Sequence, residues 1–342
     1  MKKIGILTFQ NANNYGAVYQ AFALKKTVEK LGYEVGVINY DSPSMGLKRI
    51  QQSQFSNFIG RYLNLTPEYS KKEEIEITDF SAIISGSDQV WNPRLTGNDM
   101  TYFLDFVEDD VKKISYAASI GLNGDLFMEY KDVFDRYVPK FHGISLREET
   151  HVPYIQSIVQ DKEVISSVDP SLLLTSKEYL DAFNLPDERS EDFIFVFSYA
   201  LDPKMYDFAN MLSLKTGDKI VALAPYNSGN FIDSACILKN VPPVEWLELF
   251  NKAKLIITDS FHGMMFSIIF NKPFYAYTPN RSNVARVKDI LKKLGLEDRK
   301  LTNIKNVNDV SLAINYESVN EILEKERQKS INYLKKQLNE NS

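Results

Sequence analysis

The chain has 342 residues, which is long for one ordinary hydrophobic core and suits two domains of roughly 150 residues each. Apolar residues make up 44% and charged residues 25%, the mix of a globular protein, and the formal net charge of −5 argues against a nucleic-acid partner. A single cysteine, Cys236, excludes an internal disulfide and a cysteine-rich metal site, and it fits a reducing cytoplasm.

Neither a signal peptide nor a membrane helix is expected. The N-terminal stretch MKKIGILTFQNANNYG has only a short apolar run after its lysines, and Asn and Gln follow too early for a signal peptide. No stretch approaches the roughly 18 apolar residues of a membrane helix. We therefore expect a cytoplasmic protein, for which contact with the inner face of the membrane stays open because a lipid-linked substrate would be met there.

The first forty residues predict one right-handed crossover unit of a parallel sheet. A buried strand, KIGILTF, leads through the loop NANNYGA into a helix that ends at Gly32, and the strand YEVGVINY follows. The next segment, 45–79, is polar and irregular and contains the charge run KKEEIEI. It is either a solvated helical excursion or a lid that faces an acceptor.

Further strand patterns follow at 81–86, 113–119, 142–146 and 163–168. Residues 171–193 lose the pattern and hold a proline and a charged cluster, so they are the best candidate for an interdomain linker. A second series of strands comes at 193–200, 219–225, 254–259 and 272–277.

These elements predict an α/β protein with two Rossmann-like domains that face a cleft. The expected first domain is 1–175, with 45–79 on the acceptor side, and the second is 190–312. The remaining residues, 313–342, predict an amphipathic helix that packs back on the first domain. Because ligands of open parallel sheets bind beyond the carboxyl ends of the strands, candidate site residues are those that follow strands.

Two strand ends near the N-terminus carry candidate substrate-binding residues. After the first strand come Asn14, Tyr15 and Gly16, where a helix start either faces an anion or the residues only shape a turn. After the third strand come Ser87 and Asp88. The Asp88 carboxylate would take a proton from a substrate hydroxyl or bind a sugar, or it would cap the next helix.

Two further residues follow the fifth and sixth strand patterns. Arg147, in SLREE, presents a planar guanidinium suited to carboxylate or phosphate, unless it pairs with a neighbouring Glu. Asp169 precedes a proline and is expected to shape a turn.

The stretch TDSFHG (258–263) joins a buried strand to a helix that is apolar nearly all round. Ser260 or the preceding Asp can cap that helix, whose start suits a phosphate. His262 at this place can donate, accept or carry a proton, and we favour this role over that of a structural histidine. After the next strand, Asn283 and Arg286 stand at another helix start, where Arg286 either binds an anion or forms a surface salt bridge.

Several other chemistries find no support. GxGxxG, the P-loop and G-x-S-x-G are absent, and the three histidines show no metal spacing. No cofactor is expected, and a divalent metal is left open because no carboxylate cluster demands one.

Seven stretches in this order resemble the polysaccharide pyruvyl transferases over about residues 3–299: GILTFQNANNYGAVYQAFAL, ISGSDQVWNP, SYAASIG, ISLREE, VDPSLLL, TDSFHGMMFSIIF and NVARVKDILKKLGL. The resemblance implies a GT-B-like fold. It also implies transfer of pyruvate from phosphoenolpyruvate to two hydroxyls of a sugar, as a cyclic ketal. The implied acceptors are bacterial exopolysaccharides, capsules or secondary cell-wall polymers, often as lipid-linked precursors.

The family's histidine falls on His262, and its two characteristic arginines fall on Arg147 and Arg286. We expect His262 to transfer the proton or contact the leaving phosphate, with Asp88 as a weaker candidate for the base. The second domain is the expected side for phosphoenolpyruvate. Two alternatives stay open at this stage: a nucleotide-sugar-dependent GT-B glycosyltransferase, and a non-catalytic module that binds sugars or anions.

Overall fold

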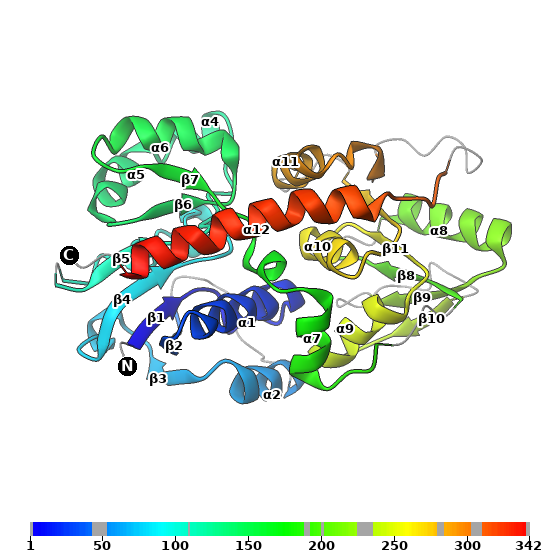
Figure 1. The fold of residues 1–342 in the computed structure, drawn as a ribbon, viewed down its shortest axis with the longest axis horizontal. Coiled ribbons are helices and arrows are strands. Elements are labelled where there is room, and N and C mark those ends of the chain that lie inside the picture. The colour runs from blue at the N-terminus through cyan, green and yellow to red at the C-terminus, as the bar shows by residue number, and fades with distance from the viewer. Residues whose placement is uncertain are drawn as a thin grey trace. The chain divides into compact units, whose positions relative to one another are not determined.

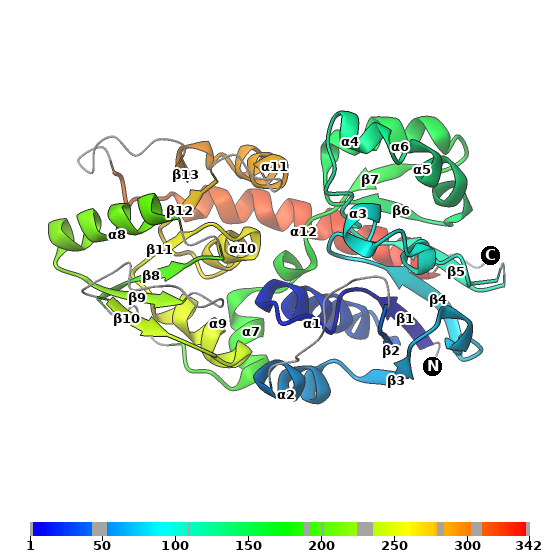
Figure 2. The same ribbon diagram turned by 180° about the vertical axis from the view of Figure 1, so that it is seen from behind.

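The computed structural model describes residues 3–42, 53–108, 110–187, 192–199, 202–223, 235–278, 284–301 and 310–339. The chain divides into two compact units, 1–173 together with 324–342, and 174–323. Each unit is built on a parallel β-sheet with helices packed against it (Figures 1 and 2).

The first unit contains a five-stranded parallel sheet in the order β3-β2-β1-β4-β5. A parallel pair, β6 and β7, continues it through single bridges from Ile114 to Gly143 and from Ala118 to Leu146. The strands are β1 (Lys3–Leu7), β2 (Glu34–Tyr40), β3 (Leu65–Tyr69), β4 (Phe80–Ser85), β5 (Lys112–Ser115), β6 (Ile144–Leu146) and β7 (Val164–Ser166). An aromatic-rich core lies against this sheet, with Trp91 stacked on Phe103 at 5.4 Å between ring centroids.

Helices and short 3₁₀ turns connect these strands. The helices are α1 (Tyr15–Lys30), α2 (Ser53–Tyr62), α3 (Pro93–Thr96), α4 (Asp125–Met128), α5 (Lys131–Tyr137) and α6 (Val152–Ile158). The 3₁₀ turns are η2 (Lys72–Glu74), η3 (Met100–Phe103), η4 (Val138–Lys140), η5 (Glu149–His151) and η6 (Pro170–Leu173). Helix α1 is buried over most of its length, which explains why its sequence is rich in Ala and apolar residues on more than one face.

The second unit contains a six-stranded parallel sheet in the order β10-β9-β8-β11-β12-β13. The strands are β8 (Phe193–Phe197), β9 (Lys219–Leu223), β10 (Ala235–Leu238), β11 (Leu255–Thr258), β12 (Phe274–Tyr277) and β13 (Lys300–Leu301). The helical segments are α7 (Ser176–Phe183), α8 (Pro203–Thr216), α9 (Pro243–Lys252), α10 (Phe261–Ile269), α11 (Val284–Leu294) and η7 (Glu297–Arg299). The central strands β8 and β11 are buried throughout, as parallel strands covered on both faces should be.

Helix α12 (Tyr316–Asn339) crosses from the second unit to the first, since the first unit includes the chain from Glu324 onward. Within the first unit, Ser330 Oγ accepts a hydrogen bond from the Val168 backbone N–H at 3.1 Å. The Tyr333 hydroxyl donates to the Ser115 carbonyl at 2.8 Å. The buried positions of the helix lie along one face, at steps of four or seven residues, with Tyr333 beside them: Val319, Leu323, Ser330, Leu334 and Leu338.

Two expectations about local structure need correction. The boundary between the two units, at residues 173 and 174, falls inside the expected linker 171–193. The segment has regular structure all the same, because it holds η6 and the helix α7, which starts with a capping box between Thr175 and Glu178. The polar segment 45–79 is more than a helix or lid, because its residues 65–69 form the edge strand β3. Its proline, Pro67, is tolerated at an edge. Residues 45–52 of that segment lie outside the described residues.

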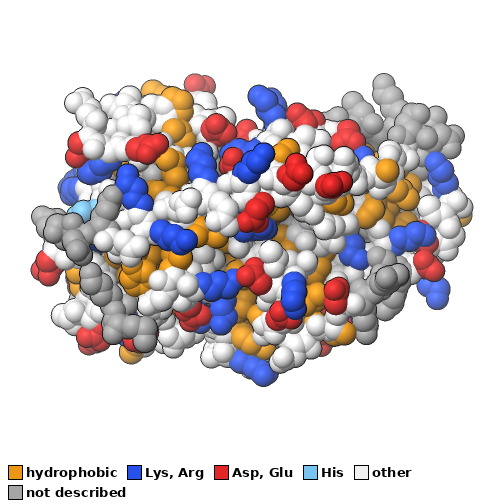
Figure 3. Space-filling view, in the orientation of Figure 1, with side chains coloured by type: hydrophobic (Ala, Val, Ile, Leu, Met, Phe, Trp, Pro, Cys, Tyr) orange, Lys and Arg blue, Asp and Glu red, His pale blue; other side chains and the backbone are white. Residues whose placement is uncertain are grey.

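Basic and acidic side chains are interspersed on the face of the molecule drawn in Figure 3, in keeping with the modest net charge. Among the described residues, no helix has both the length and the apolar composition needed to cross a bilayer.

Candidate functional site

A buried charge network joins the carboxyl ends of three strands in the first unit. The Arg147 guanidinium, which follows β6, lies 2.6 Å from Asp169 Oδ2 and 3.7 Å from Asp88 Oδ1. Its Nη2 also donates to Ser87 Oγ at 2.7 Å. The side chains of Arg147 and Asp169 are 4% and 1% exposed, whereas that of Asp88 is 15% exposed. Asp88 is therefore the member of this network that solvent or a substrate reaches most easily.

Asp169 is held in place by its own turn. Its Oδ1 accepts hydrogen bonds from the Ser171 backbone N–H at 2.9 Å and from Ser171 Oγ at 2.6 Å. The expected turn is therefore present, but the same carboxylate also neutralises Arg147. The neighbour Glu148 is not the partner of Arg147, because its carboxylate accepts hydrogen bonds from the Ser119 hydroxyl and the Ile120 N–H.

The loop after β4 has an unusual backbone at Gly86 and Asp88. Gly86 has φ +122°, and a Cβ there would lie 2.4 Å from the Tyr116 carbonyl oxygen, so glycine is required. Asp88 has φ +70°, a left-handed conformation that Asp tolerates better than most residues, and its Oδ1 accepts the Gln89 N–H at 2.8 Å. The carboxylate thus makes a local turn contact and does not cap α3, whose N-cap is Asn92.

The three candidates at the start of α1 have structural roles in the first unit. Asn14 is the N-cap, with its Oδ1 accepting the Ala17 N–H at 3.1 Å. The buried Tyr15 ring packs against Phe55 of α2 at 4.9 Å between centroids. Gly16 is buried in the first turn of the helix. The Asn14 side chain thus caps its own helix, which agrees with the alternative that these residues only shape a turn.

In the second unit, the turn between β11 and α10 is tightly built. Ser260 is the N-cap of α10, and its Oγ accepts the Gly263 N–H at 3.2 Å. A Cβ on Gly263 would lie 2.3 Å from Thr258 Oγ1 and 3.0 Å from the Phe197 ring, so only glycine lets the helix start this close to the sheet. This close approach fixes where the side chains of the first helical turn can lie.

Asp259 does not cap α10 and instead connects two strand ends. Its carboxylate accepts the Ser198 hydroxyl at 2.7 Å and the Tyr199 N–H at 2.8 Å, both from the segment after β8. Burial, together with the negative charge of Asp259, raises the pKa of Tyr206 to about 12. Tyr206 is therefore a neutral hydroxyl at physiological pH. The hydrogen bonds of Asp259 hold the carboxyl ends of β8 and β11 together.

The Phe261 ring contacts both of the second unit's main candidates. The His262 ring meets it edge to face, with centroids 5.2 Å apart and an interplanar angle of 85°. The Arg286 guanidinium lies over the same ring, with Cζ 5.4 Å from the centroid. Both Phe261 and His262 are buried. An imidazole, an aromatic ring and a guanidinium therefore form one group at the start of α10.

The predicted site residues divide between the two units. The first unit contains Asn14, Tyr15, Gly16, Ser87, Asp88 and Arg147. The second unit contains Ser260, His262 and Arg286. Asn283 lies outside the described residues.

The sequence predicted only a turn role for Asp169, not its pairing with Arg147, and did not single out Phe261. Asp169 follows β7, the parallel neighbour of the strand that Arg147 follows, so pairing β6 with β7 would have placed the two side chains together. Phe261 stands directly beside His262 in TDSFHG, but its contact with Arg286 depends on how α11 packs.

Among the described residues, no group of three or more His, Cys, Asp or Glu side chains is arranged to hold a metal ion. His142 Nδ1 accepts the Lys113 N–H at 3.1 Å, and the His151 ring lies 5.0 Å from that of Phe127. Both histidines thus make contacts within the fold of the first unit.

A model of the family described as polysaccharide pyruvyl transferase matches residues 14–281, well over half of the chain. The chain belongs to the polysaccharide pyruvyl transferase family. This pyruvyl transferase is therefore an enzyme of the transferase class, as its sequence motifs predicted. The match spans every described site residue except Arg286, which follows its last residue by five positions. A search of curated proteins gave no match.

Solved structures show the same fold in distant proteins. UDP-GlcNAc 2-epimerase from Neisseria meningitidis, bound to UDP-GlcNAc, aligns with a TM-score of 0.54 at 12% identity, over 100% of this chain and 95% of that one. The UDP-N-acetylglucosamine 2-epimerase of Rickettsia bellii gives 0.52 at 11% identity, with coverage of 98% and 96%. Arabidopsis thaliana UGT89C1, complexed with quercetin, gives 0.50 at 9% identity, with coverage of 98% and 92%. The predicted α/β, GT-B-like fold with two Rossmann-like domains is confirmed, and identities this low carry the fold alone.

Proposed function

We propose that this pyruvyl transferase moves pyruvate from phosphoenolpyruvate to a sugar of a bacterial surface polysaccharide, or of its lipid-linked precursor. Protonation of the donor's methylene carbon leaves positive charge at C2, and a sugar hydroxyl attacks there. Phosphate departs, and a second hydroxyl of the same sugar closes a cyclic ketal. The products are the ketal and inorganic phosphate, so the reaction needs no oxidant or reductant.

The observation that supports this proposal most directly is the group of His262, Phe261 and Arg286 at the start of α10. A donor that carries a phosphate and a carboxylate needs cationic and N–H-rich contacts. Arg286 supplies a permanent positive charge, and the start of α10 supplies the positive end of a helix dipole. We propose that these two bind the anionic donor, with Ser260 holding the helix start in place and Asn283 as a further contact.

We propose His262 as the residue that transfers the proton. An imidazole donates and accepts protons near neutral pH, which is what protonation of a weakly basic carbon requires. Its edge-to-face contact with Phe261 limits the directions in which the ring points. The Phe261 ring that His262 contacts also contacts Arg286, the proposed anion-binding residue.

In the first unit we propose Asp88 as the base for an acceptor hydroxyl, because its carboxylate is the most accessible member of the buried network. Arg147 then acts mainly as a positioning residue, since Asp169 already balances its charge and its Nη2 holds Ser87. Asn14, Tyr15 and Gly16 contribute the backbone of the α1 start. We place the enzyme in the cytoplasm, where an acceptor carried on a lipid would be met at the inner membrane face.

Two donors separate this proposal from a nucleotide-sugar glycosyltransferase on the same fold. We expect phosphoenolpyruvate to raise the thermal unfolding temperature and UDP-GlcNAc to leave it unchanged. A ligand at a hundredfold its Kd stabilises the native state by about 2.7 kcal/mol. Release of inorganic phosphate from phosphoenolpyruvate should then require a polysaccharide acceptor. Stabilisation by UDP-GlcNAc alone would contradict the proposal, as would the lack of any acceptor-dependent phosphate release.

A further inference from the structure

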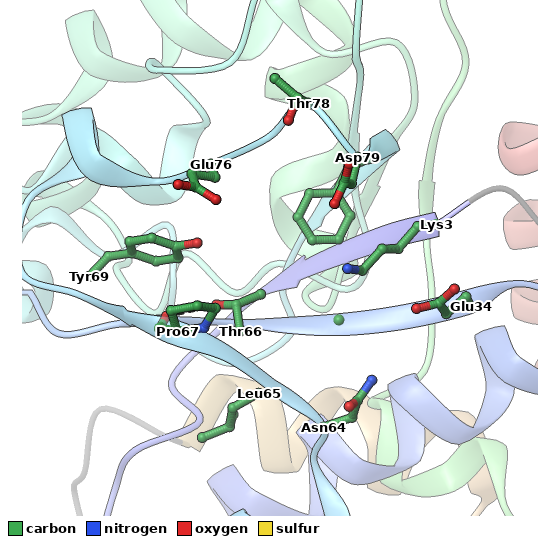
Figure 4. Close-up of a pocket in the computed structure, with 12 residues that line it drawn as sticks. Lys3, Glu34, Asn64, Leu65, Thr66, Pro67, Tyr69, Glu76, Thr78 and Asp79 are labelled. Carbon is green, nitrogen blue, oxygen red and sulfur yellow. Dashed lines mark hydrogen bonds between the residues drawn. The ribbon is translucent and has the colours of Figure 1, made fainter.

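A polar cavity of about 230 Å³ lies in the first unit at the amino ends of its strands (Figure 4). Lys3, Glu34 and Phe80 are the first residues of β1, β2 and β4, and all three line it. The predicted site residues of this unit follow the last residues of its strands, at the opposite edge of the sheet. The cavity is thus a separate feature from the candidate site.

The floor of the cavity follows from the strand sequences. Lys3, Glu34 and Phe80 are paired neighbours across β1, β2 and β4, so their side chains lie on the same face of the sheet. The Phe80 ring lies over Gly36, where a Cβ would be 3.3 Å from the ring carbons. The Lys3 ammonium lies 5.2 Å from the centre of the same ring. A glycine in β2 therefore leaves room for an aromatic floor with a cation at its edge.

The edge strand β3 supplies one wall through a bulge. Val37 pairs with Leu65 and Asn39 with Glu68, so β3 has one more residue than β2 between the two pairs. Both residues in that stretch, Thr66 and Pro67, line the cavity. Bulges re-aim side chains and often accompany binding sites. The irregular strand that the sequence analysis missed is thus the element that opens this space.

The segment between β3 and β4 forms the outer wall. Figure 4 shows the Tyr69 hydroxyl, the Lys3 ammonium and the carboxylates of Glu76 and Asp79 around the same space. Among the described residues, Glu34, Glu76 and Asp79 form no salt bridge. Three carboxylates against one ammonium give the lining a net charge of −2. Phosphates and other anions are therefore disfavoured in it.

We propose that this cavity binds one neutral sugar unit. Its volume of about 230 Å³ accommodates a single sugar ring. The lining combines carboxylate acceptors, an amide, hydroxyls, an ammonium donor and two aromatic rings. A sugar ring, which has hydroxyls on its rim and C–H groups on its faces, finds both polar and aromatic partners there. A divalent cation fits less well, since the Lys3 ammonium lies in the lining.

The biological role rests on the proposed function: the cavity would hold a second sugar of the acceptor polymer, away from the sugar that receives pyruvate. Strand β4 has six residues, which at about 3.3 Å each span roughly 20 Å between the cavity edge and Asp88. A monosaccharide at the catalytic residues therefore leaves the cavity empty, whereas a polymer would occupy both. Loss of the cavity should raise the KM for a polymeric acceptor and leave that for phosphoenolpyruvate unchanged.

Ligand-observed NMR on the full chain tests the binding step without knowledge of the natural acceptor. The probes are the methyl glycosides of glucose, galactose, mannose and N-acetylglucosamine, with galacturonate as an anionic probe and spermidine as a cationic one. We expect at least one neutral glycoside to bind with a Kd on the order of 1 mM, as suits a ligand of this size. The double variant Glu76→Ala/Asp79→Ala should weaken that binding about tenfold. Both side chains are exposed, so the fold should be kept.

The matched control is Glu68→Ala/Glu73→Ala, which removes two exposed carboxylates from the same part of the chain, outside the cavity. Its glycoside affinity should equal that of the wild type. The inference is overturned if no neutral glycoside binds, if only spermidine binds, or if the control loses affinity equally. Stabilisation by phosphoenolpyruvate, measured on the same samples, reports separately on the proposed function, because it should persist in both variants.

Discussion

Phe261 brings His262 and Arg286 into contact with one rigid ring, and at the residue scale this is the feature that the proposed chemistry depends on most. A guanidinium that lies over an aromatic face stays fully charged, so Arg286 keeps its capacity to bind an anion. The imidazole beside the same ring has fewer orientations than it would have in solvent. The side chain between the two candidates is therefore expected to matter although it has no acid, base or charge.

Replacing the ring should show in donor affinity. In Phe261→Leu the volume is largely kept but the cation–π contact of Arg286, worth about 0.5–1 kcal/mol, is lost. We expect the KM for phosphoenolpyruvate to rise about two- to fivefold, and Phe261→Tyr to restore the wild-type value. Steady-state phosphate release measures both. Equal KM values in the leucine and tyrosine variants would show that Phe261 only fills space.

The imidazole itself should be needed for turnover. In His262→Asn the proton-transfer group is lost, and we expect kcat to fall by about 10²-fold or more while donor-induced thermal stabilisation persists. His142→Asn is the control: the ring of this exposed histidine accepts the Lys113 N–H of the neighbouring strand, it is not among the candidate site residues, and its replacement should leave kcat unchanged. Wild-type turnover by the His262 variant would remove it from the mechanism.

Local patterns predicted part of the site and could not predict the rest. His262 was found because a cap, a strand and a helix start are all written within TDSFHG. The partner of Arg147 was not found, because Asp169 lies in the next parallel strand's loop and only the pairing of β6 with β7 makes them neighbours. The sequence offered Glu148 as a nearer partner, and the fold directs that side chain to Ser119 instead.

At the element scale, Asp99 joins the end of β2 to η3. Its carboxylate accepts hydrogen bonds from the hydroxyls of Tyr40, Ser42 and Thr101 and from the Thr101 N–H. Burial alone would raise the pKa of the Asp99 carboxyl, but these hydrogen bonds outweigh it and hold the pKa below its ordinary value. The ionised carboxylate is thus the form that the folded state prefers.

This preference predicts a pH-dependent effect of Asp99→Asn. A carboxyl whose pKa is lowered by folding contributes stability above its unfolded pKa, near 4, and loses it as pH falls through the folded value. We expect the free energy of unfolding to drop by about 1–3 kcal/mol at pH 7, and the deficit to shrink towards pH 3. Urea titrations at pH 7, 5 and 3 measure it, with the exposed Asp110→Asn as control. A deficit that stays constant with pH would contradict the assignment.

Elements with apolar runs were predictable, and those without them were not. The strands KIGIL and LIIT are continuous apolar segments, and the structure has them as β1 and β11. Strand β3, LTPEY, has a proline and a glutamate and pairs on one side only, so its sequence gives no strand pattern. Strand β5 ends at Ser115, earlier than expected, because Ala117 turns the chain with φ +44°. Helix α7 escaped prediction because charges and Pro186 follow its capping box closely.

At the scale of the whole molecule, α12 is the element that the two units share in sequence. An apolar face was visible in its sequence, and we expected it to form a closing helix over 313–342. Spacing alone does not reveal that the unit boundary falls inside the helix, at residues 323 and 324, because such a boundary is set by tertiary contacts. We expected domains of 1–175 and 190–312. The units of the structure are 1–173 together with 324–342, and 174–323.

The second half of α12 should contribute to the stability of the first unit. Leu334 is fully buried, so Leu334→Ala should lower the free energy of unfolding by about 2–5 kcal/mol. Leu214→Ala, at a side chain that is 88% exposed on α8, should change it by less than about 0.5 kcal/mol. Hydrogen exchange should locate the loss in β5 and β7. Faster exchange confined to β8 and β9 would show that the helix stabilises the other unit instead.

The first unit is assembled from both termini of the polypeptide, with the Tyr33 hydroxyl donating to Asn339 Oδ1 at 2.6 Å near the very end of the described chain. During synthesis, domains generally fold in the order in which they emerge from the ribosome. Here the first unit is not complete until the last helix emerges, because the Ser115 carbonyl and the Val168 N–H are bonded by Tyr333 and Ser330 of α12. The strands of the second unit are all translated before α12 is complete, so we expect that unit to finish folding before the first one does.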